Sequence, residues 1–261
     1  MKPSTRRRLF RGSLYVVFIA AVAAVLILAD WKAIKVHFLD LEVAKAMFPE
    51  IIVTAAKNTI VYTAIAFVGG LLLGLLLALM KLSPVGPYRW VATGYIELFR
   101  GLPALLVIFG FAFAVPLAFQ WRPPGGNASL GLIALIVVSG AYIAETIRAG
   151  IEAVPPGQSE AARSLGMGPA WTMISVVLPQ AFRIITPPLT NELVILIKDT
   201  SLLFIAGMAL GDRELTTFAR DAVSQTANST PLIMAALMYL VITLPLTQLV
   251  AKLERHQKRG R

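Results

Sequence analysis

The sequence predicts an all-α integral membrane protein with about six transmembrane helices, each needing about 20 mostly apolar residues. Hydrophobic residues make up 57% of the 261 residues and charged residues only 15%, whereas an ordinary soluble domain has roughly 25% charged residues. The basic residues lie mainly at the chain ends and in short segments beside apolar runs. This placement is typical of membrane proteins, so the net charge of +10 does not indicate a nucleic-acid partner.

The first predicted crossing covers residues 14–31. A cleaved signal peptide is the alternative, but this apolar run exceeds the roughly 7–15 residues of a signal-peptide core, and no clean cleavage site follows it. Residues 32–50 mix charged and apolar side chains and are expected outside the membrane. We therefore treat residues 1–50 as an N-terminal region made of a cytoplasmic end, one helix and an external segment.

The second and third crossings are separated by a predicted interfacial helix. Residues 52–80 form a long apolar run, in which Gly70 and Gly74 make a GxxxG pattern that suits close helix packing. Residues 84–100 mix aromatic and charged side chains, which favours a helix at headgroup level on the cytoplasmic side. A Gly-Leu-Pro break then begins the third crossing at 103–119.

The second half of the chain supplies the other three crossings, predicted at residues 130–147, 171–197 and 231–250. A Pro- and Gly-rich loop at 120–129 and a polar, helix-patterned segment at 207–230 are expected outside. Residues 148–169 form a polar stretch between the fourth and fifth crossings, on the cytoplasmic side.

An even number of crossings places both ends of the chain on one side. Basic residues gather before the first crossing and after the last one, namely Lys2, Arg6, Arg7, Arg8, Arg11, Lys252, Arg255, Lys258, Arg259 and Arg261. Because cytoplasmic segments are enriched in Lys and Arg, we expect both termini in the cytoplasm, with residues 253–261 as a basic tail.

The chain carries no motif of a self-contained enzyme. It lacks GxxxxGK[ST], HExxH and GxSxG, so it offers no P-loop for ATP, no zinc-protease helix and no nucleophile elbow. It has no cysteine, which excludes disulfides and thiolate metal sites. We expect no catalytic residue, no cofactor and no metal in this chain.

Several polar residues lie within or beside the apolar runs. Glu145 and Arg148 are spaced i,i+3 at the inner end of the fourth crossing and are expected to form a structural ion pair. Asn58, Thr59 and Thr63 give the second crossing a polar stripe, which suits either hydrogen bonding between helices or the lining of a pathway.

The fifth crossing carries the best candidates for a substrate pathway. Asn191 and Glu192 follow two consecutive prolines, which free carbonyl groups in the preceding turn. Irregular backbone at membrane depth is tolerated where it lines a protein-buried or wet cavity, and an intramembrane carboxylate could bind an amino group. Lys198, Asp199 and Thr200 follow at the outer end, where they serve either as further pathway residues or as an interfacial cluster.

The segment from 157 to 168 reads as one short helix isolated by prolines on both sides. It follows the pattern EAA-x3-G-x9-I-x-LP through Glu160-Ala161-Ala162, Gly166, Val176, Leu178 and Pro179, with Val in place of Ile. This loop resembles the cytoplasmic loop of permease subunits of bacterial ABC importers. Further segments resemble the polar amino-acid permeases of the histidine/glutamine/arginine type, namely 97–103, 145–151, 179–183 and 198–202.

The resemblance implies a five-helix type I ABC importer core, over about residues 51–252, with one added N-terminal helix. It implies a coupling helix that docks on an ATPase subunit, with contacts from Glu160, Ala161, Ala162, Arg163, Leu165 and Gly166. The implied partners are two ATPase subunits, a second permease subunit (the same chain or a related one), a periplasmic binding protein, the amino-acid substrate and the lipid bilayer.

The predicted function is therefore a permease subunit in the bacterial inner membrane that imports polar amino acids while a partner chain hydrolyses ATP. The alternative is a secondary transporter driven by an ion gradient, which would also use broken helices and an intramembrane Glu. The sequence leaves open which amino acid is carried and what the N-terminal helix contributes.

Overall fold

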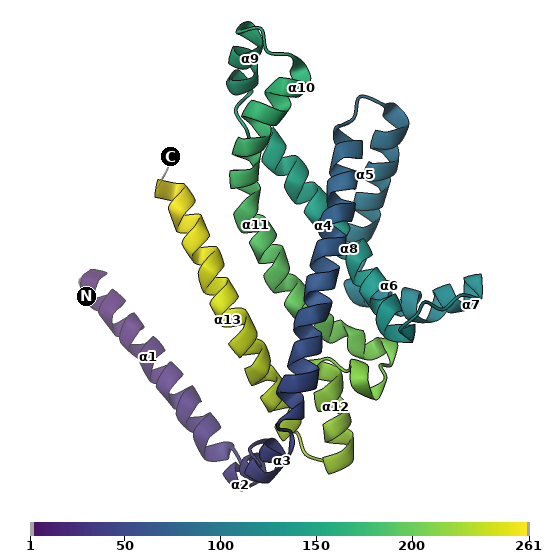
Figure 1. Cartoon of the computed structure of the whole chain (residues 1–261). Coiled ribbons are helices and arrows are strands. Elements are labelled where there is room, and N and C mark those ends of the chain that lie inside the picture. Colours follow the sequence, from purple (N-terminus) through teal and green to yellow (C-terminus); the bar gives the residue numbers. More distant parts are fainter. Residues whose placement is uncertain (1–2, 260–261) are drawn as a thin grey trace.

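The computed structural model describes the backbone of residues 3–259 and the side chains of residues 12–253 and of Arg255. The described residues form helices joined by short turns, without strands (Figure 1). The α-helices are α1 Pro3–Leu28, α2 Trp31–Phe38, α3 Leu41–Ala46, α4 Lys57–Leu82, α5 Gly86–Gly101, α6 Ala104–Phe109, α7 Val115–Phe119, α8 Gly126–Glu152, α9 Pro156–Ser164, α10 Pro169–Thr172, α11 Leu178–Asp199, α12 Leu215–Thr226 and α13 Thr230–Arg259. Three π-helical segments (η1 Ile51–Ala56, η2 Gly110–Ala114, η3 Met173–Val177) and two 3₁₀ segments (η4 Thr200–Ala206, η5 Leu210–Asp212) continue them.

Helices α4 and α8 pack together along most of their length and form the centre of the bundle. Gly70 and Gly74 of α4 face Ser139 and Ile143 of α8. A Cβ atom at Gly74 would lie 2.8 Å from Ile143 Cγ2 and 3.0 Å from the Ala144 amide nitrogen. The GxxxG pattern therefore serves contact within this chain, because any larger side chain would hold the two helices apart.

The prediction of an interfacial helix at 84–100 is wrong. Helix α5 packs against both α4 and α8, and it buries Ala92 and Ile96 in that contact. It then bends by 104° into the segment Ala104–Phe119, so the two parts form one broken span or a re-entrant loop. A helix with one buried face has the same amphipathic pattern as a helix on a membrane surface, which explains the error. Pro103 at the break lacks an amide donor and cannot continue the helix.

Among the residues that the structure describes, three helices are long and apolar enough to cross a membrane: Ile51–Leu82, Gly126–Glu152 and Thr230–Leu253. The number rises to five if each bent pair counts as one span, the second pair being Gly12–Leu28 with Trp31–Ala46, bent by 70°. Helix α11 is not among them, because Arg183, Asn191 and Glu192 lower its hydropathy. It nevertheless runs beside α8 and α13 within the bundle (Figure 1). The all-α membrane fold is confirmed.

The N-terminal helix α1 lies apart from the bundle in Figure 1. Its link to the rest of the chain is the α2–α3 elbow, which packs against α13. The Ser229 amide donates to the His37 carbonyl at 2.8 Å, and the Asn228 side-chain amide donates to the Val36 carbonyl at 2.8 Å. The predicted basic clusters lie outside the described side chains, namely Lys2, Arg6, Arg7, Arg8, Arg11, Lys258, Arg259 and Arg261.

Helix α13 ends on the side of the bundle where α9 lies, and α12 lies at the opposite side (Figure 1). We refer to these sides as the α9 end and the α12 end. The polar segments fall at these two ends, whereas the apolar clusters around α4 and α8 lie between them. The candidate functional residues are therefore divided among the α9 end, the α12 end and one cavity between helices.

Candidate functional site

Helix α9 projects from the α9 end of the bundle between α8 and α11 (Figure 1). It is shorter than the predicted helix over 157–168, because it begins at Pro156 and stops after Ser164. Of the predicted coupling residues only Ala162 is buried, and Glu160, Ala161, Arg163, Leu165 and Gly166 are all exposed. Leu165 is 86% exposed. Leu165 thus exposes a large apolar side chain at the tip of a polar segment.

The end of α9 is held in one defined geometry. The Met167 amide donates to the Ala162 carbonyl and the Gly166 amide to the Arg163 carbonyl, and Gly166 has φ +88°. This is the pattern of a Schellman motif, in which glycine takes the left-handed position. On the bundle side, the Gln180 side chain donates to that of Gln158 at 3.3 Å. These hydrogen bonds therefore give the exposed surface of α9 a defined orientation relative to the bundle.

The predicted Glu145–Arg148 ion pair is present in α8, where the Arg148 Nε atom lies 3.0 Å from a Glu145 carboxylate oxygen. Two further residues of this cluster were not predicted from the sequence. Lys81 of α4 lies 3.1 Å from Glu145, and Glu152 also pairs with Arg148. Side chains that are about a fifth exposed, as Lys81, Glu145 and Arg148 are, gain more from pairing than fully solvated ones. The cluster joins the ends of α4 and α8 just before the chain turns into α9.

A cavity of about 290 Å³ lies between α6, α8 and α11. Helix α11 contributes Glu192, Ile195, Leu196 and Asp199, which share one face of the helix at spacings of three, four and seven residues. The other lining residues are Ala104, Leu135, Val138, Ser139 and Tyr142. Glu192 and Asp199, which the sequence analysis selected, are thus brought together at opposite ends of a mostly apolar surface.

The other predicted pathway residues do not line this cavity. Asn191 and Lys198 are exposed on another part of α11. Thr200 is buried, and its hydroxyl donates to the Ile197 carbonyl at 2.6 Å. In the polar stripe of α4, the Asn58 side chain donates to the Gly211 carbonyl at 2.8 Å. Asn58 therefore links α4 to η5.

Arg100 of α5 contacts Tyr142 of α8, which is one of the residues that line the cavity. The Arg100 guanidinium carbon lies 5.7 Å from the centre of the Tyr142 ring, within reach of a cation–π interaction. The Tyr142 hydroxyl donates to the Arg100 carbonyl at 3.4 Å. Sequence reasoning did not select these two residues, since their positions 42 residues apart gave no sign of contact.

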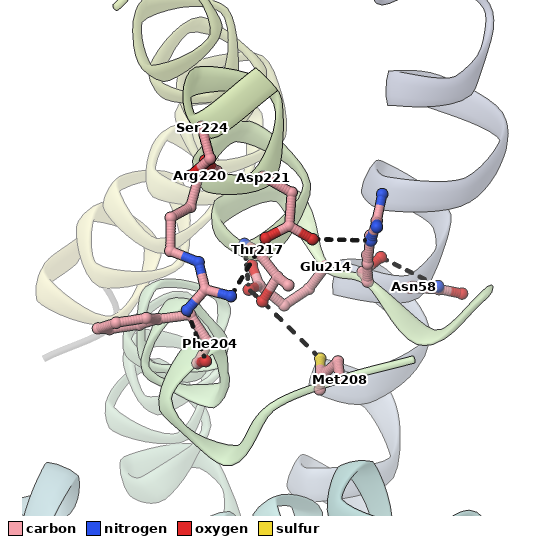
Figure 2. A network of polar contacts seen from close by, with 9 residues as sticks. Asn58, Phe204, Met208, Glu214, Thr217, Arg220, Asp221 and Ser224 are labelled. Carbon is pink, nitrogen blue, oxygen red and sulfur yellow. Dashed lines mark hydrogen bonds and ion pairs between the residues drawn. The ribbon is translucent and has the colours of Figure 1, made fainter. Parts of the chain in front are cut away.

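A second polar cluster lies at the α12 end (Figure 2). Asp221 of α12 accepts a hydrogen bond from Arg220 at 3.1 Å and pairs with Arg213 at 3.0 Å. Arg220 also lies over the Phe204 ring, 5.8 Å from its centre. Asn58 of α4 bonds to the carbonyl of Arg213 at 3.1 Å. These contacts connect α4, η4 and α12 into one cap on the bundle.

Glu214 is the most deeply buried ionisable side chain of this cap, at 0% exposure. It caps the N-terminus of α12, where its carboxylate accepts hydrogen bonds from the backbone amides of Thr216 and Thr217 and from the Thr217 hydroxyl. The Tyr239 hydroxyl of α13 donates to it at 3.1 Å. Burial raises the pKa of Glu214, and these hydrogen bonds oppose that rise. An acidic residue directly before a helical pattern was the signal available in the sequence.

Comparison with known proteins identifies the class. Residues 70–259 match the family model described as "Binding-protein-dependent transport system inner membrane component". The chain belongs to this family, whose members are permease subunits of bacterial ABC importers in the inner membrane. The ATPase of such importers is a separate subunit, so the prediction of a transport subunit without ATPase activity of its own is confirmed. None of the comparisons supports an ion-gradient transporter.

Individual relatives resemble the chain over most of its length. It is 38% identical over 206 residues to the probable glutamine ABC transporter permease GlnM of Bacillus subtilis, which covers 78% of this chain and 91% of GlnM. It is 36% identical over 221 residues to the arginine transport system permease ArtQ of the same organism, covering 82% of this chain and 96% of ArtQ. A crystal structure of an amino acid ABC transporter with histidines superimposes with a TM-score of 0.75 at 38% identity, over 83% of this chain and 97% of that one.

Proposed function

We propose that this chain is the membrane-spanning subunit of an importer for polar amino acids, fed by a periplasmic binding protein. Relatives named for glutamine and arginine transport support this substrate class. Two copies of an ATPase would bind at the α9 end, and a second permease subunit, identical or related, would complete the pathway. Residues 51–252 would form the transport unit, residues 1–50 an added N-terminal part and residues 253–261 a cytoplasmic tail.

The coupling contact would be made by α9 and the turn after it. Glu160, Arg163 and Leu165 would supply contacts to the ATPase, while Ala161 and Gly166 allow close approach. This assignment rests on the exposure of Leu165, which follows a short helix whose end is held by backbone hydrogen bonds. A rigid helix held between α8 and α11 can transmit a push into the bundle if two packings of the bundle exist.

The α9 end would face the cytoplasm, since the ATPase binds there. Helix α13 ends on the same side (Figure 1), which agrees with a cytoplasmic C-terminus. The N-terminus would lie on this side as well, because basic residues precede the first apolar helix. The pathway would include Glu192 and Asp199 in the cavity, with Asn191, Lys198 and Thr200 on other faces of the same segment.

Substitution of Gly166 by Trp tests the coupling assignment. Gly166 has a positive φ, and a Cβ atom there would meet no neighbour within 4 Å, so the change alters the exposed surface and strains the turn. We expect the protein to remain in the membrane while ATP-driven uptake is lost. Gly12→Trp is the matched control, since Gly12 also has open space around it but lies in α1. Uptake by Gly166→Trp equal to that of Gly12→Trp at equal expression would refute the assignment.

A further inference from the structure

The N-terminal helix α1 is apolar on every side, and the bundle does not cover it. No charged residue lies between Leu14 and Ala29. The large apolar side chains of this stretch are exposed, for example Leu14 at 54% and Leu28 at 84%, and α1 stands apart from α13 in Figure 1. A helix that is hydrophobic all round and is not buried in protein fits the interior of a bilayer. We therefore expect lipid to surround α1.

The elbow after α1 marks the level of the membrane surface. Asp30 is the first charged residue after the apolar stretch, and the chain bends by 70° between Gly12–Leu28 and Trp31–Ala46. In the proposed topology α1 crosses the hydrocarbon layer, so this bend turns α2 toward the plane of the membrane surface. Trp31 lies at the bend, is 56% exposed and donates its indole N–H to the Leu26 carbonyl at 2.8 Å. Tryptophan is enriched at membrane–water interfaces, which places α2 among the lipid headgroups.

Helix α2 has a defined orientation relative to α13. The hydrogen bonds from Asn228 and Ser229 reach its backbone carbonyls, and Ile34 is partly buried. Lys32 and Lys35 are exposed. Because they are three residues apart, they are neighbours on the surface of the helix. The two lysines therefore lie on a side of α2 that the bundle does not cover.

These lysines lack an anionic partner within the chain. Among the residues that the structure describes, neither Lys32 nor Lys35 forms a hydrogen bond or an ion pair. The nearby carboxylates are engaged elsewhere. Asp30 and Asp40 accept hydrogen bonds from the backbone amides that begin α2 and α3, and Glu42 pairs with a lysine of its own helix. Helix α2 thus presents two cationic side chains at the level of the lipid headgroups.

We propose that α2 binds the phosphate groups of anionic phospholipids through Lys32 and Lys35, and so anchors the N-terminal segment at the α12 end. Lipid is the partner that fits, because it already surrounds α1 and its headgroups lie at the level of Trp31. A headgroup with a net negative charge attracts both lysines, whereas a zwitterionic headgroup carries no net charge to attract them. The surface uses the proposed topology but does not depend on which amino acid the importer carries.

The test uses the full chain in phosphatidylcholine vesicles that contain a small fraction of nitroxide-labelled phosphatidylglycerol or nitroxide-labelled phosphatidylcholine. Leu39→Cys provides one site for a fluorophore, because the chain has no cysteine and Leu39 is 54% exposed at the end of α2. Quenching of the fluorophore reports how strongly each lipid associates with α2. Since each lysine near an anionic surface contributes about fivefold in binding, we expect phosphatidylglycerol to associate at least about fivefold more strongly than phosphatidylcholine. This preference should fall at high salt.

The double substitution Lys32→Gln and Lys35→Gln should abolish the preference. Lys45→Gln is the matched control and should leave it unchanged, since Lys45 is an exposed lysine of α3 that pairs with Glu42. Equal quenching by the two lipids with both lysines intact overturns the proposal, as does a preference that persists in the double variant. Quenching by neither lipid also overturns it, and shielding of the fluorophore by added binding protein would then identify a protein as the partner. ATP-driven uptake tests the transport function separately from these outcomes.

Discussion

Substitution of Gly74 by Ala tests the close packing of α4 against α8. In an open helical site this change stabilises a helix by about 1 kcal/mol. At Gly74 the new Cβ would lie 2.8 Å from Ile143 Cγ2, 2.9 Å from Ile143 Cβ and 3.0 Å from the Ala144 amide nitrogen, whereas ordinary contacts begin at 3.4 Å. Because the Ala144 atom belongs to the backbone, side-chain rotation cannot relieve this contact. The two helices must separate by a few tenths of an ångström.

Overpacking of this kind costs about 1–3 kcal/mol, and the better helix propensity of Ala recovers about 1 kcal/mol of it. The net loss is therefore up to about 2 kcal/mol, which lowers the melting temperature of a protein of this size by up to roughly 8 °C. The assay is thermal unfolding of the purified protein in a fixed detergent. Gly94→Ala in α5 is the matched control, since a Cβ there would meet nothing within 4 Å. A Gly74→Ala melting temperature at or above that of Gly94→Ala would refute the packing argument.

Three further predictions concern the two polar clusters and the turn after α9. Lys81→Met removes one of the two cations that pair with Glu145. It should lower the free energy of unfolding by roughly 1–2 kcal/mol, measured by thermal unfolding, because both side chains are only about a fifth exposed. The same change at the solvated Lys45 should cost almost nothing, and equal effects of the two substitutions would contradict this reasoning. Gly166→Ala should reduce the uptake achieved per ATP hydrolysed, because an L-residue is strained at φ +88°; an unchanged ratio would argue against it. Glu214→Ala should destabilise the fold by about 1–3 kcal/mol, since it leaves buried donors without an acceptor, and a neutral effect on the melting temperature would be inconsistent with that role.

The long apolar helices and the α9 segment were predictable because their signals are local. The run that became α4 and the proline-bounded segment around α9 each carry their pattern within a few turns of helix. Helix α5 was misassigned because its half-buried face has the same period as a helix at a membrane surface. Whether such a face meets lipid headgroups or other helices depends on how α4 and α8 are placed. The sequence of α5 alone does not contain this information.

Only part of the cavity could be predicted, because only its residues on α11 carry a local signal in the sequence. Glu192 and Asp199 stood out as charges within or beside an apolar run, and the helical period places them on one face. Arg100 of α5 meets Tyr142 of α8, and Lys81 of α4 meets Glu145 of α8 although these last two residues lie 64 positions apart in the sequence. A single sequence does not report such pairings, because each residue alone is compatible with a solvated surface.

The central claim is that this chain carries substrate inward only when a partner ATPase drives it through the α9 end. The most direct measurement is amino-acid uptake into proteoliposomes that contain this permease, its ATPase and its binding protein, with and without ATP and with ionophores that collapse proton and sodium gradients. Uptake should require ATP and should survive collapse of both gradients. Uptake that continues without ATP and stops when a gradient is collapsed would contradict the account.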